Sequence, residues 1–406
     1  MRILHINSMI SGSTGQIMRD LAQFCSKDEV YVSYPAFDGI IRGVPRSLVI
    51  GNRVDTFIHH CLGRLTGLNG RFSYFTTKKF LSHITKIHPD IIHLHNLHNC
   101  YINLGLLFDY IKKNKIAVIW TLHDCWAFTG QCAYFDMFGC EKWRSECDNC
   151  QQLFRYPKSW VDHTKQMYRY KKKKFIGIDN LVVVTPSLWL AGLVKDSYLG
   201  TYPIKVINNG VDLNIFRPMT NKWSRYKTNG KFLILAVAFK WDKRKGFDIL
   251  VEVSKKMDKK NYQMIVVGVS AKQKLELDKN VICIGKTNNR EELANIYSTA
   301  DVFINPTREE NFCMVNIEAL ACGTPVITFR SGGASEAIDD TCGIILEEKN
   351  SMAILRAIND VRKKDYKILD CVRQANKFEK NKVYNEYVNL YKEILERNSH
   401  DCVGVT

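Results

Sequence analysis

Hydrophobic and polar positions follow two alternating patterns along the chain. Apolar runs of strand length recur, and stretches with the 3.6-residue period of an amphipathic helix lie between them. In the first half the strand-like runs are 2–6, 91–94, 117–122, 181–185 and 205–207. Helical periodicity is clear in 17–25 and 78–87. This alternation predicts βαβ units, which build parallel sheets.

A second series of the same kind follows a polar, glycine-terminated break at 220–230. Its strand-like runs are 232–238, 263–267, 281–284, 302–305 and 325–328. The pattern predicts an α/β fold with two doubly wound, Rossmann-like domains. We expect an N-terminal domain over 1–215 and a C-terminal domain over 216–382. The segment 383–406 is predicted to be a helix, with tyrosines and leucines on one face, that packs back toward the N-terminal domain.

The length of 406 residues agrees with two domains, because one hydrophobic core rarely supports so long a chain. The N-terminal segment resembles a first strand and lacks the apolar core of a signal peptide. No apolar run is long enough for a membrane-spanning helix. Fourteen cysteines without a secretory signal favour a reducing compartment, so the cytoplasm is the expected location.

The charge balance is strongly positive, with 58 Lys and Arg against 41 Asp and Glu and a net charge of +17. Anionic lipid, nucleic acid or a phosphorylated substrate would each complement this charge, and so would a lysine-rich surface that binds nothing. The basic run 169–175 could contact the inner face of a membrane peripherally, or it could be a solvated helix face. No recognisable nucleic-acid-binding module is present, so we expect no nucleic-acid partner.

The most informative loop follows the strand-like run 302–305. A polar loop carries Glu310, and a helix beginning near residue 312 carries Glu318 about two turns later. A strand, loop and helix in this order present backbone N–H groups and the positive end of a helix dipole, which favour a phosphate. The two carboxylates can accept hydrogen bonds from vicinal sugar hydroxyls. The pattern therefore suits a ligand that carries a phosphate and a ribose or a hexose.

Glu310 and Glu318, separated by seven residues and followed by A-L-A-C-G-T-P-V, resemble the signature of glycosyltransferase family 4. The resemblance implies the GT-B fold, in which two domains face across a cleft. It also implies that Glu310 contacts the donor sugar and Glu318 the nucleotide ribose. Asn311 and Phe312 stand where the family often has Gly-Phe, and they are carried over as donor-binding residues.

Two further segments resemble the family in order and spacing. The loop 208–218 contains N-G-V-D, as at the exit from the family's N-terminal domain. The segment 237–246 resembles the one that carries the diphosphate-binding cations, which implies this role for Arg244 and Lys245. The usual arginine is replaced by Phe239, and Lys240 beside it is the candidate substitute. Lysines at a solvated loop tip are the alternative explanation.

Small residues follow the first strand-like run at 11–15, where Gly12 and Gly15 would let a phosphate or sugar approach the backbone. A tight strand-to-helix turn would need the same glycines. The segment T-L-H-D resembles the family's cleft histidine segment, so His123 is the candidate for orienting the donor sugar or the acceptor. His93, His95 and His98 could bind a metal, or they could be solvated loop histidines.

The resemblance implies retaining transfer of a hexose from a UDP- or GDP-sugar to a glycan or lipid-linked acceptor, in surface polysaccharide biosynthesis. The chain lacks an Asp-x-Asp pair, so we expect no catalytic metal. A nucleotide-sugar epimerase or a phosphorylase could share the fold, and a basic nucleic-acid-binding protein is the remaining alternative.

Four cysteines, Cys132, Cys140, Cys147 and Cys150, fall within nineteen positions after the His123 segment. The final Cys-x-x-Cys has the spacing of a metal knuckle, and the other two thiols could complete a Cys₄ zinc site. Such a zinc would be structural, because four thiolates leave no open position for substrate. Disulfides and four reduced thiols are the alternatives.

Overall fold

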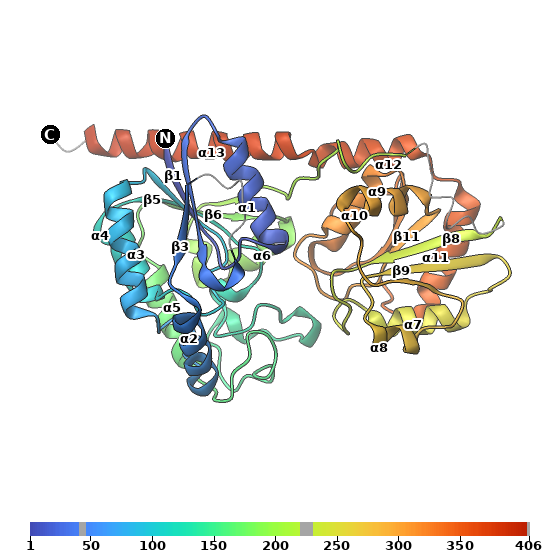
Figure 1. Cartoon of the computed structure of the whole chain (residues 1–406), viewed down its shortest axis with the longest axis horizontal. Coiled ribbons are helices and arrows are strands. Elements are labelled where there is room, and N and C mark those ends of the chain that lie inside the picture. The colour runs from blue at the N-terminus through green and yellow to red at the C-terminus, as the bar shows by residue number, and fades with distance from the viewer. Residues whose placement is uncertain (40–45, 220–229, 404–406) are drawn as a thin grey trace. The chain divides into compact units, whose positions relative to one another are not determined.

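The computed structural model describes residues 1–39, 46–219 and 230–403, with side chains described to residue 397. The chain divides into two compact units, Met1–Ile207 together with Tyr384–Thr406, and Asn208–Val383 (Figure 1). Each unit is built around one parallel sheet. The polar break predicted at 220–230 lies outside the described residues except for its last position.

The first unit has a seven-stranded sheet in the order β3-β2-β1-β4-β5-β6-β7. Its strands are β1 (Arg2–Ile6), β2 (Glu29–Pro35), β3 (Ser47–Ile50), β4 (Ile91–Leu94), β5 (Ala117–Thr121), β6 (Leu181–Thr185) and β7 (Ile204–Val206). Its helices are α1 (Gly12–Phe24), α2 (Arg53–Thr66), α3 (Tyr74–Ile87), α4 (Leu104–Lys113), α5 (Thr164–Phe175) and α6 (Leu188–Asp196).

The second unit has a six-stranded sheet in the order β10-β9-β8-β11-β12-β13. Its strands are β8 (Phe232–Val237), β9 (Tyr262–Val267), β10 (Ile282–Ile284), β11 (Val302–Asn305), β12 (Val326–Phe329) and β13 (Gly343–Leu346). Its helices are α7 (Phe247–Lys256), α8 (Ala271–Glu276), α9 (Arg290–Thr299), α10 (Met314–Ala321), α11 (Ser351–Lys364) and α12 (Ile368–Ala375).

Helices cover both faces of each sheet, and this explains the continuous apolar runs in the sequence. In β4, for example, Ile91, Ile92 and Leu94 are fully buried, and β1 pairs with β4 from Ile3 opposite Ile91. One buried hydrophobic cluster fills the first unit, and two clusters occupy the second. The loops at the strand ends are therefore held on rigid elements.

The direction in which strands are added reverses once in each sheet, between β1 and β4 and between β8 and β11. At such a switch point the two loops leaving the carboxyl ends of the strands diverge, and the crevice between them is where open α/β sheets bind ligands. The predicted site segments follow β1 and β5 in the first unit, and β8 and β11 in the second. The candidate residues thus lie at or next to the two switch points.

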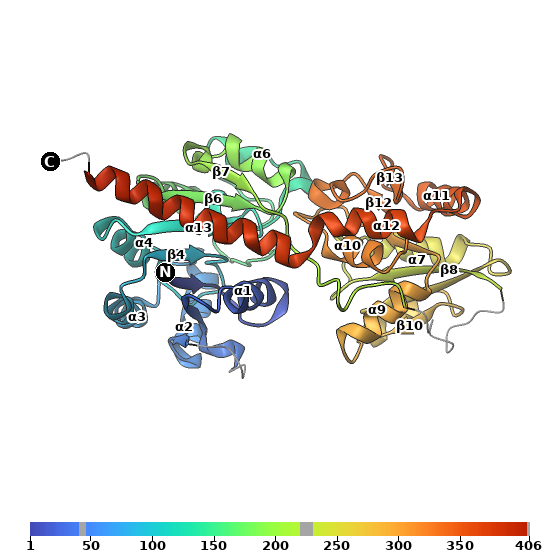
Figure 2. The ribbon, with the colours of Figure 1, turned by 90° about the horizontal axis from the view of Figure 1, so that it is seen from above.

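The last helix, α13 (Lys380–Val403), begins in the second unit and continues in the first. Figures 1 and 2 both show it lying over the first unit's sheet, where the Tyr391 hydroxyl is 2.7 Å from His93 Nδ1. The Tyr387 hydroxyl is 3.1 Å from Thr121 Oγ1, and the Tyr384 ring contacts Phe24. The apolar face of this helix therefore belongs to the core of the first unit.

Candidate active site

In the second unit, the loops after β8 and β11 meet through an ion pair. Lys245 Nζ bonds to the carboxylate of Glu310, and Arg244 Nη1 lies 4.0 Å from the same oxygen. Gly246 makes the approach possible, because it has a φ of 76° and a Cβ there would lie 2.1 Å from the carbonyl oxygen of Pro306. The structure thus brings together three residues that the sequence pattern places in two separate loops.

Glu318 lies on α10, the helix that follows the loop with Glu310. Burial raises the pKa of Glu318 to about 7, and Arg290 opposes that rise. The Tyr297 hydroxyl donates a hydrogen bond to Glu318 Oε2 at 3.3 Å. The carboxyl group is therefore poorly solvated and gains from any further hydrogen-bond donor that reaches it.

The other predicted residues of this unit differ in their surroundings. Phe312 is buried and its ring contacts Phe378, so its side chain contributes to the core. Asn311 is buried in the same loop, whereas Lys240 is exposed. Phe239, which replaces the usual arginine of the family, is 97% exposed. A fully exposed aromatic ring next to the cations is a feature to which the sequence pattern assigned no role.

In the first unit, the loop after β1 is held by a carboxylate that sequence reasoning missed. Asp38 accepts hydrogen bonds from the backbone N–H groups of Ile10 and Ser11, and from the Ser11 hydroxyl at 2.5 Å. Gly15 is required by the turn itself, since a Cβ there would lie 2.3 Å from the Ile10 carbonyl oxygen. Gly12 has a φ of 69°, and a Cβ there would lie 3.9 Å from Met9 Cε, an ordinary van der Waals contact. Asp38 thus engages the amide of Ser11, in the predicted phosphate loop, and that of Ile10 just before it.

His123 ends a chain of buried imidazoles. His5 Nδ1 lies 3.1 Å from His95 Nε2, and His95 Nδ1 lies 3.1 Å from His123 Nε2. Burial lowers the pKa of His123 to about 4 and that of His5 to about 3. These side chains are therefore uncharged at neutral pH. His5 and Tyr391 were not predicted, because only the sheet order and α13 bring them to this cluster.

The interpretation of His93, His95 and His98 as solvated loop residues is wrong, because all three are buried. Among the described residues, the nitrogens of His5, His93 and His95 lie within 4.8 Å of one another, as metal ligands could. However, the His93 nitrogens bond to Tyr391 and, at 2.8 Å, to Thr121. The geometry is thus that of a hydrogen-bonded core cluster.

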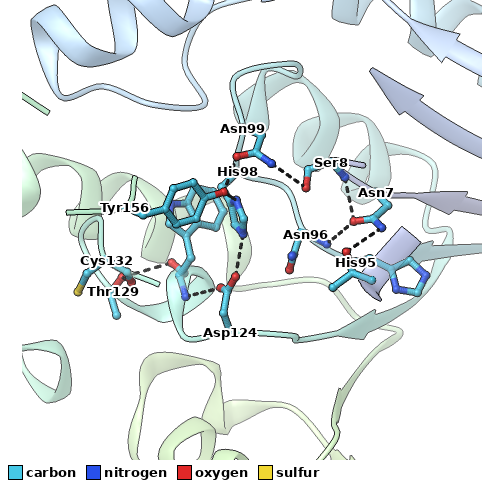
Figure 3. A network of polar contacts seen from close by, with 12 residues as sticks. Asn7, Ser8, His95, Asn96, His98, Asn99, Asp124, Thr129, Cys132 and Tyr156 are labelled. Carbon is cyan, nitrogen blue, oxygen red and sulfur yellow. Dashed lines mark hydrogen bonds and ion pairs between the residues drawn. The ribbon is translucent and has the colours of Figure 1, made fainter. Parts of the chain in front are cut away.

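Figure 3 shows a second polar network at the same switch point. His98 Nε2 lies 2.8 Å from Asp124 Oδ2, and His98 Nδ1 lies 2.7 Å from the Tyr156 hydroxyl. Tyr156 in turn bonds to Asn99, which reaches Ser8 Oγ at 3.3 Å. Burial raises the pKa of Asp124, but His98 and the Trp126 N–H more than offset it, so the net shift is downward. The network joins the loops after β1, β4 and β5.

The four cysteines of the predicted metal loop line one cavity of about 330 Å³. All four are unpaired, and Cys147 Sγ accepts a hydrogen bond from the Gly130 N–H at 3.1 Å. Burial raises the pKa of Cys147 to about 11. Within the described residues, these cysteines are not among the groups of three or more side chains that are placed to hold a metal ion. The four thiols thus line one cavity, but they do not form a ready-made metal-coordination site.

The basic run 169–175 lies on α5 and is largely engaged with the protein. Lys171 is fully buried, donates to the Trp126 carbonyl oxygen at 2.5 Å and has a pKa that burial lowers to about 7. Arg169 pairs with Glu146, and Lys174 lies 2.6 Å from Asp109. Arg169, Lys172 and Lys173 are exposed, but Arg169 is held in its pair with Glu146. The run is therefore not a continuous basic surface.

Comparison with known proteins agrees with this architecture. The family model "Glycosyltransferase Family 4" matches residues 15–215, and "Glycosyl transferases group 1" matches residues 220–382. Over 277 residues the chain is 27% identical to WcaC of Escherichia coli K12, named for colanic acid biosynthesis, and the match covers 66% of each chain.

Solved structures share the fold along nearly the whole chain. Sucrose-phosphate synthase from Thermosynechococcus elongatus has a TM-score of 0.71 at 18% identity, over 98% of this chain and 99% of that one. HepE of Anabaena, solved with UDP, has a TM-score of 0.68 at 16% identity, over 97% and 100%. The fold is the GT-B fold, and the two family models identify the chain as a glycosyltransferase. The chain belongs to glycosyltransferase family 4, so the predicted fold class and family are confirmed.

Proposed function

We propose that this glycosyltransferase moves a hexose, with retention of configuration, from a UDP- or GDP-sugar to a glycan or lipid-linked acceptor in surface polysaccharide biosynthesis. The cluster of Lys245, Arg244 and Glu310 at the β8/β11 switch point carries the proposal. The likeness to HepE, solved with UDP, and to WcaC, named for colanic acid biosynthesis, supports the donor class and the pathway type.

The cluster suits a sugar diphosphate. Lys245 and Arg244 supply two positive charges for the phosphates, and Glu310 accepts hydrogen bonds from the sugar hydroxyls. Glu318, whose carboxyl is poorly solvated, binds the ribose hydroxyls. When the diphosphate binds, it takes over Lys245 and releases Glu310 from its ion pair. Donor binding thus frees the carboxylate that the sugar needs.

The reaction breaks the bond between the anomeric carbon and the phosphate oxygen, and the acceptor oxygen bonds to that carbon on the same face. The acceptor proton passes to the leaving phosphate oxygen. Lys245 and Arg244 stabilise the charge that grows on the leaving diphosphate, as metal-independent transfer requires. His123, which is uncharged at neutral pH, orients the donor sugar or the acceptor through a hydrogen bond.

A structural zinc in the cysteine loop is part of the proposal. The four thiols share one cavity, and the N–H group that donates to Cys147 Sγ would also stabilise a thiolate. Four cysteines are the donor set of a closed zinc site, in which the ion would bind all four as thiolates and so hold the loop in place. The side chains would have to move to bring the sulfurs together.

Transfer to a polyprenyl-diphosphate-linked sugar, with each of several nucleotide sugars as donor, tests the function. We expect release of one nucleoside diphosphate for each sugar transferred. The first-formed product should have the anomeric configuration of the donor in its proton NMR spectrum. An inverted product would refute retention. Conversion of the donor without acceptor would instead indicate an epimerase.

A further inference from the structure

Helix α2 packs with its polar side inward and its apolar side outward. Val54, Phe57, Ile58 and Leu65 are 66%, 66%, 51% and 51% exposed. They follow each other at spacings of three, one and seven residues, so they form one stripe along the helix. The buried residues of α2 are Thr56, His59 and Gly63, on the opposite face. A helix on a soluble surface normally has the reverse orientation.

Hydrogen bonds fix α2 in this orientation. His59 Nδ1 lies 2.8 Å from Ser73 Oγ, and His59 Nε2 accepts the Gly70 N–H at 3.1 Å. Ser73 Oγ donates to Asp55 Oδ2 at 2.7 Å, and Asn52 caps the helix. Turning the helix to bury the stripe would break these bonds. The exposed stripe is therefore part of the folded state.

The apolar surface extends beyond the helix. Trp160 and Val161 are 62% and 41% exposed. The backbone N–H of Trp160 donates to the carbonyl oxygen of Arg64 at 2.9 Å, so Trp160 lies next to the end of the helix that carries Leu65. We call Val54, Phe57, Ile58, Leu65, Trp160 and Val161 the α2 patch. Figure 1 shows α2 at the periphery of the first unit. Contiguous exposed apolar surface of this kind marks an interaction site.

Cations lie next to the α2 patch. Arg64 and Lys158 line a cavity of about 190 Å³, and no carboxylate is among the described residues that line it. The Nε atom of Arg64 is buried and has no hydrogen-bond partner within the described part of the chain. Arg53 lies on the same helix, whereas Asp55 is turned toward Ser73. Three cations thus border the patch, and the exposed carboxylate beside it, that of Asp162, is hydrogen-bonded to Thr164 and to the Cys150 N–H.

We propose that the α2 patch docks on the surface of an anionic lipid bilayer. Its apolar side chains enter the boundary between headgroups and acyl chains, Trp160 lies at the headgroup level, and Arg64 with Lys158 bind lipid phosphates. An outward apolar face bordered by cations is the arrangement of a helix that lies in a membrane interface. The proposal rests on the proposed function in one respect, since a lipid-linked acceptor is found at such a surface.

Flotation with vesicles tests the proposal. We expect the wild type to bind vesicles containing about a third phosphatidylglycerol and to bind pure phosphatidylcholine at least about tenfold more weakly. Salt at about 0.5 M should weaken the binding without abolishing it, because screening removes only the electrostatic part. The Phe57→Gln/Ile58→Gln variant should bind the acidic vesicles at least about tenfold more weakly than the wild type.

The matched control is Leu275→Gln/Leu369→Gln, which removes two side chains of the second unit that are 86% and 80% exposed. It should float like the wild type. Both variants should keep the thermal shift caused by UDP or GDP, which reports the fold without lipid. Equal vesicle binding by the Phe57→Gln/Ile58→Gln variant and the wild type would overturn the proposal.

A second copy of the chain is the other possible occupant of the α2 patch. A wild type that sediments as a dimer, becomes monomeric in the Phe57→Gln/Ile58→Gln variant and does not float would also overturn the proposal. Failure of the proposed function gives a different result, namely vesicle binding without sugar transfer to any acceptor. If the Phe57→Gln/Ile58→Gln variant no longer transfers sugar to a lipid-linked acceptor but still transfers it to a water-soluble acceptor, the docking role is supported.

Discussion

Replacing Glu318 with Gln should change the stability of the protein and its affinity for the donor in opposite directions. Burial raises the pKa of the Glu318 carboxyl to about 7, whereas its usual value is 4.5. Between these values the folded protein holds a proton that the unfolded chain has released. The contribution of Glu318 to stability is therefore fully present below pH 4.5 and is lost as the pH rises through 7. A neutral Gln of the same shape avoids this loss.

The magnitude follows from the pKa shift of Glu318. A shift from 4.5 to about 7, at 1.36 kcal/mol per pKa unit, gives at most about 3 kcal/mol. The difference in free energy of unfolding between Glu318→Gln and the wild type should therefore increase, in favour of the variant, by up to about 3 kcal/mol from about pH 5 to pH 8.5. Urea unfolding of both proteins at each pH measures this difference. Glu276→Gln, at an exposed position of the same unit, is the control and should show no such gain.

Binding should change in the opposite direction. The carboxylate of Glu318 accepts the ribose hydroxyls in the proposed donor site, so Glu318→Gln should bind UDP or GDP about tenfold more weakly at pH 8 by calorimetry. Wild-type affinity should itself fall as the pH drops below 7, because protonation of Glu318 removes the acceptor. A variant with unchanged affinity and no pH-dependent gain in stability would refute this account of Glu318.

Three further predictions concern other parts of the molecule. Glu310→Gln should lower kcat about 100-fold with little change in nucleoside diphosphate affinity, whereas Lys245→Met should weaken that affinity at least about tenfold. Burial lowers the pKa of His5 to about 3, so the stability that neutral His5 contributes is lost as the pH falls below 6.5. Between pH 6.5 and pH 5 this loss lowers the wild-type free energy of unfolding by about 2 kcal/mol. In urea unfolding, His5→Gln should not show this part of the decrease. Elemental analysis of protein purified without chelator should find about one zinc per chain. The Cys147→Ser/Cys150→Ser variant should lack it, and the control Cys283→Ser should keep it. A folded, active wild type without metal would contradict the zinc site.

Buried central strands were predictable from the sequence, because continuous apolar runs with little polar interruption have few other solutions. The predicted 2–6, 91–94, 181–185 and 302–305 coincide with β1, β4, β6 and β11. The strands β2, β3 and β13 were missed. β3 and β13 are edge strands, and the apolar run of each, Leu48–Ile50 and Ile344–Leu346, is only three residues long. β2 carries Tyr31 and Ser33 within its run, and both interrupt the apolar pattern.

The candidate site was predictable where a loop directly follows a central strand, as for Glu310, Lys245 and His123. It was not predictable where the partner comes from elsewhere in the sheet order or from another helix. Asp38 closes the loop after β1 from 27 positions away, and Tyr391 reaches β4 from α13. The orientation of α2 was equally hidden, since its periodicity fits an inward apolar face as well as an outward one.

The two units place different electrostatics at equivalent positions of their sheets, and burial is the cause. At the β1/β4 switch point His5 and His123 are desolvated and therefore uncharged, and the Asp124 carboxylate is hydrogen-bonded to His98. At the β8/β11 switch point Lys245 and Arg244 remain partly exposed, and both lie beside the Glu310 carboxylate. A diphosphate gains from the second environment and would gain little from the first. A hydroxyl group, which needs directed hydrogen bonds more than charge, gains from the first. The proposed division into a donor unit and an acceptor unit thus follows from how deeply each sheet buries its loop residues, although the strand order of the two is alike.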